Sequence, residues 1–195
     1  MTDSDGDGTD VRRAVLLDFF PNGRSEGGRR QYQRQPLGYG LGEDSFRLFE
    51  IVFEEDAGVG IGDAVVVEPA AEREAIVDLW EIDYEDLSGG ATSELEYAIR
   101  EIIESREERF VDFFNDAQPI TLRLHQLNLL PGIGEKLRNS ILDERKRKPF
   151  ESFEELEDRV GGLHDPEDIL AERITEEIHD EDLKYRIFVG REDAE

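Results

Sequence analysis

The sequence lacks cysteine and contains very little lysine. With no Cys among 195 residues, disulfides, Cys-ligated zinc sites and thiol catalysis are excluded. No apolar run approaches the ~20 residues that span a bilayer, and the acidic N-terminus has no apolar core like that of a secretory signal. We therefore expect a cytoplasmic protein without a membrane segment. Four of the 23 basic residues are lysines, at positions 136, 146, 148 and 184.

Acidic residues, in contrast, are abundant: 49 Asp and Glu give a formal net charge of −26. Such a surface repels itself in dilute buffer, whereas at molar salt the Debye length falls to about 3 Å and the repulsion fades. This composition predicts a halophilic protein from a high-salt cytoplasm. The alternative is an acidic surface that binds a partner.

Two stretches of the chain escape this acidity. Residues 11–42 carry six basic and two acidic residues, and residues 119–160 carry eight of each, whereas residues 43–118 carry five basic and 23 acidic residues. These two segments therefore lack the excess of acidic over basic residues that the rest of the chain shows. This sparing favours a polyanionic partner.

The first half of the chain has the pattern of short strands. Apolar or alternating segments occupy residues 14–20, 46–53, 64–68 and 75–84, with turn residues and no helical pattern between them. After a disordered acidic tail over residues 1–10, this pattern predicts a small closed β-barrel of OB or SH3-like type over residues 11–88.

The second half has helical periodicity. Ser93 and Glu96 form a capping-box pattern, and the apolar residues that follow predict a long connecting helix within residues 89–118. Residues 119–180 predict an all-α domain. Apolar residues then alternate over 183–189, so we expect residues 181–195 to provide a strand that returns to the barrel. The expected fold class is α+β.

A short turn in the helical half carries the functional argument. Residues 130–134 read Leu-Pro-Gly-Ile-Gly, and a helical pattern begins directly afterwards. Gly132 and Gly134 permit a tight turn and close approach of a ligand to the backbone. The first N–H groups of the next helix have no partners within that helix, which makes its start a phosphate site.

Residues 129–160 resemble a helix-hairpin-helix motif, in which hairpin amides contact successive phosphates of DNA or RNA. The resemblance implies that the phosphate contacts come from Gly132, Ile133, Gly134, Glu135 and Lys136. It also implies a possible K⁺ or Na⁺ held by the carbonyls of Asn128, Leu130 and Ile133, and no other cofactor. The alternative is a turn that only packs helices or docks a protein.

Two neighbouring features allow two interpretations each. The basic run 145–148 either contacts phosphates or complements the dipole at the end of a helix. Residues 160–164 look like a second, altered copy of the turn, in which Gly162 and Leu163 correspond to Gly132 and Ile133. His164 replaces Gly134, so we do not expect close phosphate approach there.

The whole chain, over residues 12–190, resembles an archaeal family of unknown function whose members are described as RNA-binding. The resemblance is carried by residues 17–23, 32–39 with 42–44, 108–120, 125–134 and 162–166. It implies a small β-barrel followed by a helix-hairpin-helix region, and it favours RNA over DNA as the partner.

A loop rich in Arg and Tyr lies between the first two predicted strands. Barrels of this kind bind single strands with stacking aromatic side chains and basic loops. The candidate residues are Arg24, Arg29, Arg30, Tyr32, Arg34 and Tyr39. The alternative is an ordered loop whose tyrosines pack on the barrel.

We find no catalytic constellation in the sequence. The histidines at positions 125, 164 and 179 lack metal-ligand spacing and a nucleophile partner, and no P-loop is present. We therefore expect a non-catalytic protein that binds nucleic acid, RNA in preference to DNA, without a metal. The alternatives are a protein-interaction or assembly module, or an accessory part of a nucleic-acid processing enzyme that works with other such proteins.

Overall fold

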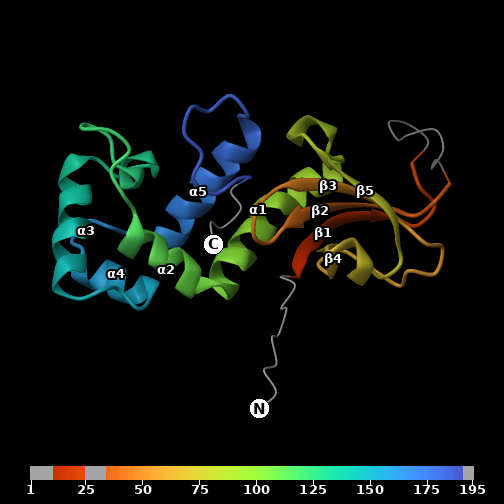
Figure 1. Ribbon diagram of the computed structural model, residues 1–195, viewed down its shortest axis with the longest axis horizontal. Coiled ribbons are helices and arrows are strands. Elements are labelled where there is room, and N and C mark those ends of the chain that lie inside the picture. The colour runs from red at the N-terminus through yellow and green to blue at the C-terminus, as the bar shows by residue number, and fades with distance from the viewer. Residues whose placement is uncertain (1–10, 25–33, 191–195) are drawn as a thin grey trace, which may run out of the picture. The chain divides into compact units, whose positions relative to one another are not determined.

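The computed structural model describes residues 11–24 and 34–190 and is of mixed α+β class (Figure 1). The chain divides into two compact units, unit 1 over residues 1–95 and unit 2 over residues 96–195. The predicted barrel region lies in unit 1 and the predicted all-α region in unit 2. The predicted connecting segment 89–118 is divided between the two units.

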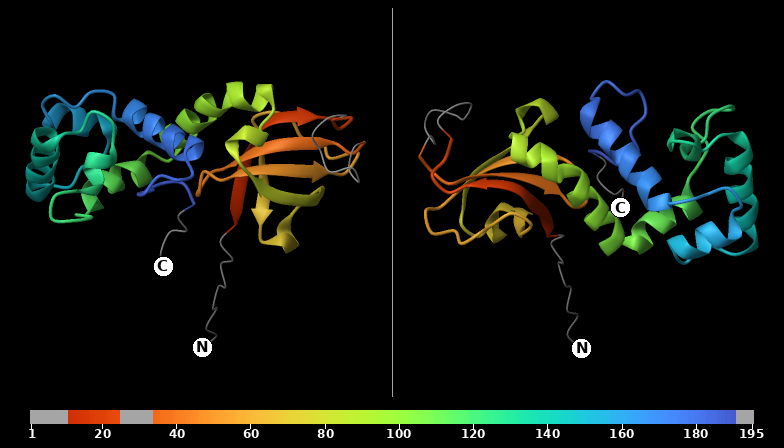
Figure 2. Two further views of the ribbon diagram at one scale, coloured as in Figure 1. Left: turned by 90° about the horizontal axis from the view of Figure 1, so that it is seen from above. Right: turned by 180° about the vertical axis from the view of Figure 1, so that it is seen from behind.

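Unit 1 is built on an antiparallel sheet with the order β4-β1-β2-β3-β5 (Figure 2). Its strands are β1 (Arg12–Phe20), β2 (Leu37–Gly42), β3 (Leu48–Phe53), β4 (Ala64–Glu68) and β5 (Ile76–Ile82). No ladder joins β4 to β5 within the described ranges. The sheet is therefore a curled half-barrel with two edges, and the closed barrel expected from the strand pattern is not formed. Two 3-10 helices, η2 (Ala70–Glu72) and η3 (Tyr84–Asp86), flank β5.

Both faces of this sheet bury apolar residues, and one of them carries a compact cluster. Because side chains alternate along a strand, every second apolar residue of β1, β3 and β4 points to the same side. The buried cluster comprises Ala14, Leu16, Ile51, Phe53, Val65 and Val67. Tyr39 and Glu50 are register partners on β2 and β3.

Helix α1 (Gly89–Ser105) begins earlier than the sequence pattern indicated. Ser88 Oγ accepts the Ala91 N–H at 3.0 Å and donates to the Asp18 carboxylate at 2.5 Å. Ser88 is thus the residue that caps the helix, and it ties the start of α1 to β1. The predicted cap at Ser93 is wrong, since the Ser93 hydroxyl donates to the Gly89 carbonyl inside the helix.

The predicted connecting helix is two helices. α2 (Glu107–Asp116) starts after Arg106, whose φ of −123° and ψ of 38° interrupt the helical backbone. The Ser105 hydroxyl donates to the Ile102 carbonyl, a side-chain bond that competes with the helical ladder at this point. α2 buries Phe110, Val111 and Phe114 in unit 2.

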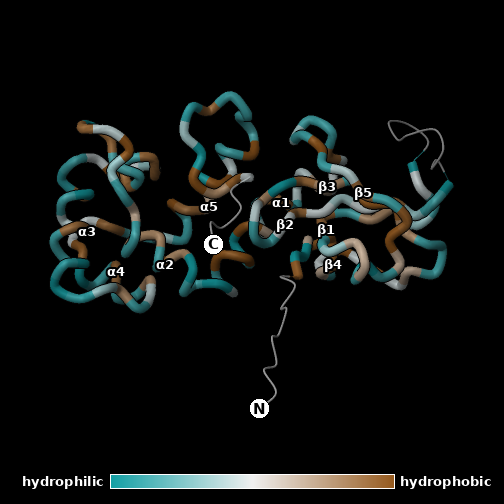
Figure 3. Tube along the Cα trace, viewed as in Figure 1, coloured by the Kyte–Doolittle hydropathy of each residue, from teal (hydrophilic) through white to brown (hydrophobic). Residues whose placement is uncertain are grey.

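The rest of unit 2 consists of short helices around one apolar core. These are η4 (Gln126–Leu129), α3 (Glu135–Arg147), α4 (Phe153–Arg159) and α5 (Pro166–His179). Their apolar positions recur at helical spacing, so each helix turns one stripe inward, and hydropathy alternates along the helices accordingly (Figure 3). The core includes Leu127, Leu130, Ile133, Ile141, Phe153, Leu156, Val160, Leu163, Leu170 and Ile174.

The C-terminal segment does not form the strand expected over residues 181–195, at least up to residue 190 where the description ends. Its backbone is instead bound by α5. The fully buried Glu177 carboxylate accepts the N–H groups of Ile187 at 2.8 Å and of Phe188 and Val189 at 2.9 Å. Arg173 Nε donates to the same carboxylate at 2.9 Å. Because this carboxylate binds the backbone donors, the segment does not need a partner strand.

No helix in the described part of the chain is long and apolar enough to cross a membrane.

Candidate nucleic-acid interface

The first turn, residues 130–134, connects η4 to α3 with an exposed backbone. Leu130 and Ile133 are buried, and the Ile133 N–H donates to the Leu130 carbonyl at 3.2 Å. Between them Gly132 has a φ of +76°, a conformation that favours glycine. Gly132 and Gly134 are exposed, and a Cβ built on either meets no atom within 4 Å. Leu130 and Ile133 thus anchor the turn in the core, while Gly132 and Gly134 stay exposed. The N–H of Ile133, which the resemblance implied as a phosphate contact, is bound internally.

The start of α3 leaves its backbone donors unused. Gly134 is the N-cap and has no side chain to cap the helix. The N–H groups of Gly134, Glu135 and Lys136 have no hydrogen-bond acceptor among the residues that the structure describes. The first internal bond is from the Arg138 N–H to the Gly134 carbonyl at 2.9 Å. Three consecutive donors therefore face solvent at the positive end of the helix dipole.

Asn128 braces the first turn. Its Nδ2 donates to the Ile133 carbonyl at 3.1 Å, and its Oδ1 accepts the His125 N–H at 3.3 Å and Arg138 Nη1 at 3.0 Å. His125 Nδ1 accepts the Leu127 N–H at 3.1 Å, so His125 and Asn128 form a capping box. Sequence reasoning gave Arg138 no role and Asn128 only a cation role. The spacing of three residues between His125 and Asn128 is the signal that would have found the brace.

His125 is nearly buried and uncharged at neutral pH. Burial, together with the nearby guanidinium groups of Arg145 and Arg138, lowers the pKa of His125 below its usual value. The bond accepted at Nδ1 places the ring proton on Nε2.

The predicted K⁺ or Na⁺ site has carbonyls of the right chemistry, two of which are already in use. The Ile133 carbonyl accepts from Asn128, and the Leu130 carbonyl accepts the Ile133 N–H. Each retains one lone pair for a cation, so the cation prediction stays a prediction.

Charge around the first turn is low in acid. Glu135 is the one acidic residue between positions 117 and 142. Lys136 is exposed and has no ion pair within the described ranges. An open depression beside the turn is bordered by Glu172 and Glu176 of α5. These carboxylates repel a phosphate on that side, so an approaching strand must lie toward α3.

The basic run 145–148 is largely committed to internal contacts. Arg145 Nη1 donates to the Phe114 and Ala117 carbonyls at 3.0 and 2.9 Å, which closes the end of α2. Arg147 pairs with a glutamate of its own helix, and Lys148 lies 3.1 Å from Glu151. Lys146 is exposed and has no ion pair in the described part of the chain. Contacts within the protein therefore explain Arg145, Arg147 and Lys148 without a phosphate, and only Lys146 of this run is left without such a contact in the described structure.

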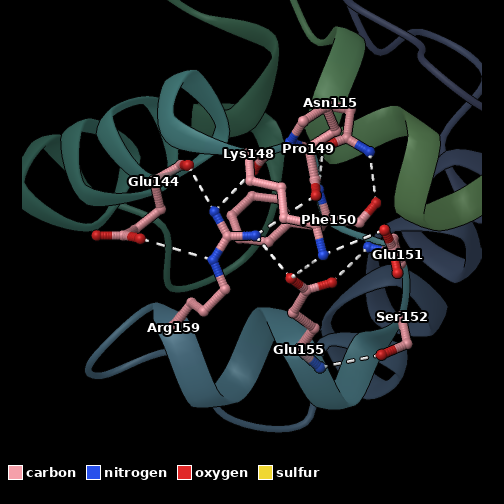
Figure 4. Close-up of polar contacts among 9 residues, drawn as sticks. All are labelled: Asn115, Glu144, Lys148, Pro149, Phe150, Glu151, Ser152, Glu155 and Arg159. Carbon is pink, nitrogen blue, oxygen red and sulfur yellow. Dashed lines mark hydrogen bonds and ion pairs between the residues drawn. The ribbon is translucent and has the colours of Figure 1, made fainter.

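Arg159 fixes the corner between α3 and α4 (Figure 4). Its guanidinium lies 4.5 Å from the centre of the Phe150 ring and donates to the carbonyls of Glu144 and Lys148 at 2.6 and 2.7 Å. Asn115 of α2 holds the Phe150 backbone with two further bonds, of 2.8 and 2.9 Å. These contacts position α3, and with it the first turn, by satisfying its last carbonyls.

The second turn, residues 160–164, repeats the backbone of the first. Gly162 has a φ of +93° where Gly132 has +76°. Leu163 is buried, and its N–H donates to the Val160 carbonyl at 3.1 Å, like Ile133 to Leu130. The correspondence between the two turns that the sequence predicts is present in the backbone.

Two backbone positions after the second turn offer no free donor. The Asp165 N–H donates to Glu157 Oε1 at 2.6 Å, and position 166 is proline, which has no N–H. Burial raises the pKa of the Glu167 carboxyl group. Of residues 164–166, only His164 has an N–H without an acceptor among the described residues, so this turn lacks the row of open amides found at the first turn and is less suited to phosphate.

The Arg/Tyr loop of unit 1 is only partly described. Arg29, Arg30 and Tyr32 lie outside the described residues. Arg24 Nη1 donates to the Tyr39 hydroxyl at 2.8 Å, and that hydroxyl donates to Glu50 Oε2 at 3.2 Å. Arg24 and Tyr39 are thus brought together, whereas Arg34 is exposed and has no ion pair with a described residue.

Tyr39 does not have the stacking role expected of it. It is 2% exposed, and burial raises the pKa of its hydroxyl. A ring so covered has no face for a base, so the alternative, packing on the sheet, holds for Tyr39. The depression beside it is also bordered by acids, namely Glu81, Glu85 and Asp86, which disfavour phosphate.

Comparison with known proteins places the chain in a family. Residues 10–190 match the model of a family described as "Protein of unknown function (DUF655)". The chain is 38% identical to the uncharacterized protein MJ0038 of Methanocaldococcus jannaschii over 178 residues, 90% of this chain and 78% of that protein. It also resembles the crystal structure of Af1531 from Archaeoglobus fulgidus, of the same family, with a TM-score of 0.80, 39% identity, and coverage of 91% of this chain and 99% of that one.

Proposed function

The chain belongs to the DUF655 family, and we propose that it is a non-catalytic nucleic-acid-binding protein whose first turn holds phosphates, with RNA favoured over DNA. In this proposal unit 1 is an OB or SH3-like half-barrel and residues 129–160 are a helix-hairpin-helix. The single observation that carries it is the row of open N–H groups at Gly134, Glu135 and Lys136 on an exposed, acid-poor turn.

Chemically, such a row suits successive phosphate oxygens. Backbone N–H groups at a helix start are fixed donors, and hydrogen bonds to an ionised oxygen are stronger than neutral ones. Lys136 adds a charged donor beside them. The preference for RNA rests on the family resemblance, because phosphate contacts alone do not distinguish the two polymers.

The net charge of −26 favours a protein that binds phosphate through backbone amides instead of through Lys and Arg side chains. We propose that the protein works at molar salt, where counterion release from Lys and Arg contacts contributes little. Directional bonds from amides survive at such salt better than diffuse attraction does. Affinity should therefore fall only weakly between about one and three molar KCl, and a steep fall would contradict the proposed mode of binding.

Gly134→Phe tests the first turn directly. The N-cap backbone, with φ of −84°, suits any residue, and a Cβ there meets nothing, so the fold is retained while the ring covers the amides. We expect affinity for a labelled RNA strand, measured by fluorescence anisotropy in molar KCl, to fall at least about tenfold.

The matched control is His164→Phe at the equivalent position of the second turn, which should leave the affinity unchanged. Circular dichroism of both variants verifies the fold. If Gly134→Phe binds RNA as well as the unmodified chain does, the first turn is not the binding site.

A further inference from the structure

The loop that precedes η4, residues 118–125, carries an apolar tip in solvent. Leu122 is 107% exposed, so its side chain touches essentially nothing in the described structure. Figure 3 shows the apolar colour at the end of this loop. Thr121 and Arg123 on either side are exposed and polar. A leucine with no intramolecular contact buries no apolar area, so Leu122 adds nothing to the free energy of unfolding.

This tip is held in one conformation. Pro119 and His125 form an antiparallel bridge at its base, and the N–H groups of Ile120 and Thr121 donate to the Leu124 carbonyl at 2.8 and 3.0 Å. Thr121 Oγ1 accepts the N–H groups of Arg123 and Leu124 at 3.2 and 3.0 Å. The backbone that carries Leu122 is therefore held in place, and little backbone entropy is lost when a ligand buries its side chain.

The loop and the first turn are connected through the side chain of Asn128. His125, the last residue of the loop, donates its N–H to Asn128, which also braces the Ile133 carbonyl. Figures 1 and 2 show residues 118–125 and the start of α3 at the same end of unit 2. Arg123 has no ion pair in the described ranges, and the loop itself contains no acid.

From this placement we propose that Leu122 inserts between two neighbouring bases of the strand whose phosphates lie on the first turn. The ligand is then an RNA with a step that is already open, such as a bulge. This inference rests on the proposed function. Apolar side chains that enter a base step do so by unstacking it, and burial of one leucine offsets only part of that cost in an intact helix. A bulge has lost this stacking already.

A protein partner fits the tip less well. Stable protein interfaces bury about 800 Å² on each partner, and one leucine between Thr121 and Arg123 does not provide such an apolar area. Arg123, in contrast, suits the phosphate beside an opened step, since guanidinium groups form charge-assisted bonds to phosphate oxygens.

The test uses the full chain in molar KCl with three RNA probes that contain 2-aminopurine. In the first probe the fluorescent base lies next to a one-nucleotide bulge in a duplex, the second is the duplex without the bulge, and the third is the single strand. We expect emission from the bulged probe to rise when the protein binds. Leu122→Ala should remove this rise and lower affinity for the bulged probe about tenfold, while affinity for the single strand stays the same.

Ile61→Ala is the matched control, because it shortens another exposed aliphatic side chain, 57% exposed in unit 1, and should change neither readout. The proposed insertion of Leu122 is wrong if the bulged probe binds without a change in emission, or if Leu122→Ala changes neither emission nor affinity. In either case the proposed phosphate binding at the first turn is unaffected. If the unmodified chain binds none of the probes, the proposed function itself fails. If Leu122→Ala changes only the oligomeric state seen by light scattering, the tip is a protein contact and the inference is overturned.

Discussion

The two turns of unit 2 share a backbone and differ in what surrounds it. Both place a glycine at positive φ ahead of a buried aliphatic residue, Ile133 or Leu163, and both lead into a helix. Around the first turn the N–H groups are open and its own chain segment holds little acid, although Glu172 and Glu176 of α5 border one side. Around the second, Glu157 occupies one donor and proline removes another. The comparison shows that the backbone geometry of a turn is not sufficient for a phosphate site. Several N–H groups must also be free of acceptors within the protein.

The largest expected effects test what the two turns have in common. Ile133→Ala and Leu163→Ala each remove a buried side chain, so each should lower the free energy of unfolding by about 2–5 kcal/mol. Guanidinium denaturation in molar KCl measures this. Only the Ile133 variant should also weaken RNA binding by the folded protein, because it lies under the open amides. An equal loss of affinity in both variants would make the second turn part of the site.

A reciprocal exchange tests what separates the turns. Gly134→His gives the first turn the side chain of the second, and we expect affinity for RNA to fall about tenfold as the side chain crowds the amides. His164→Gly should give no new binding, since the Asp165 N–H stays bound to Glu157. Titration calorimetry of both variants measures this, and a gain of affinity in His164→Gly would show that side-chain bulk is the whole difference.

Loss of the carboxylate that occupies the second turn has a smaller effect. Glu157→Gln weakens the 2.6 Å bond from the Asp165 N–H and should lower the free energy of unfolding by about 1 kcal/mol. Asp158→Asn, at an exposed neighbouring position, is the control and should be nearly neutral. Neither variant should bind more RNA, because Pro166 still supplies no donor.

The smallest effect concerns the brace of the first turn. The pKa of His125 is lowered in the folded state, so the unfolded chain binds the proton more readily. Stability should therefore decline as the pH falls through the unfolded value of about 6.5 toward the lower folded pKa. His125→Asn keeps an acceptor for the Leu127 N–H and should reduce this decline. Hydrogen exchange of amides 125–134 at pH 7.5 and 5.5 measures it, and identical profiles for both proteins would assign the pH effect elsewhere.

Local patterns were sufficient to predict the parts of the site that depend on a few neighbouring residues. Gly132, Ile133 and Gly134 specify an exposed turn with one inward anchor, and the structure has that turn. The second copy at Gly162 and Leu163 follows from the same rule. Composition also identified the segment of balanced charge, residues 119–160, that contains the first turn.

Predictions that depended on distant partners were the ones that failed. The cap of α1 was assigned to Ser93 because the residue that caps it, Ser88, is bound by Asp18, seventy positions earlier in the chain. The stacking role expected of Tyr39 is not available because its ring is buried on the sheet, where Arg24 and Glu50 bind its hydroxyl. Alternation of apolar residues near the C-terminus indicated a strand, but a buried carboxylate on α5 binds that backbone first.

That carboxylate has a practical consequence for anyone producing the protein. Glu177 is fully enclosed, and of the four groups that donate to its carboxylate in the described part of the chain, three are the amides of residues 187–189. A recombinant version trimmed before residue 187 would retain a charge in its interior with little more than Arg173 to compensate it, a situation that costs about 3–5 kcal/mol. An expression boundary drawn after the last helix would therefore discard the very residues that keep that helix soluble and folded.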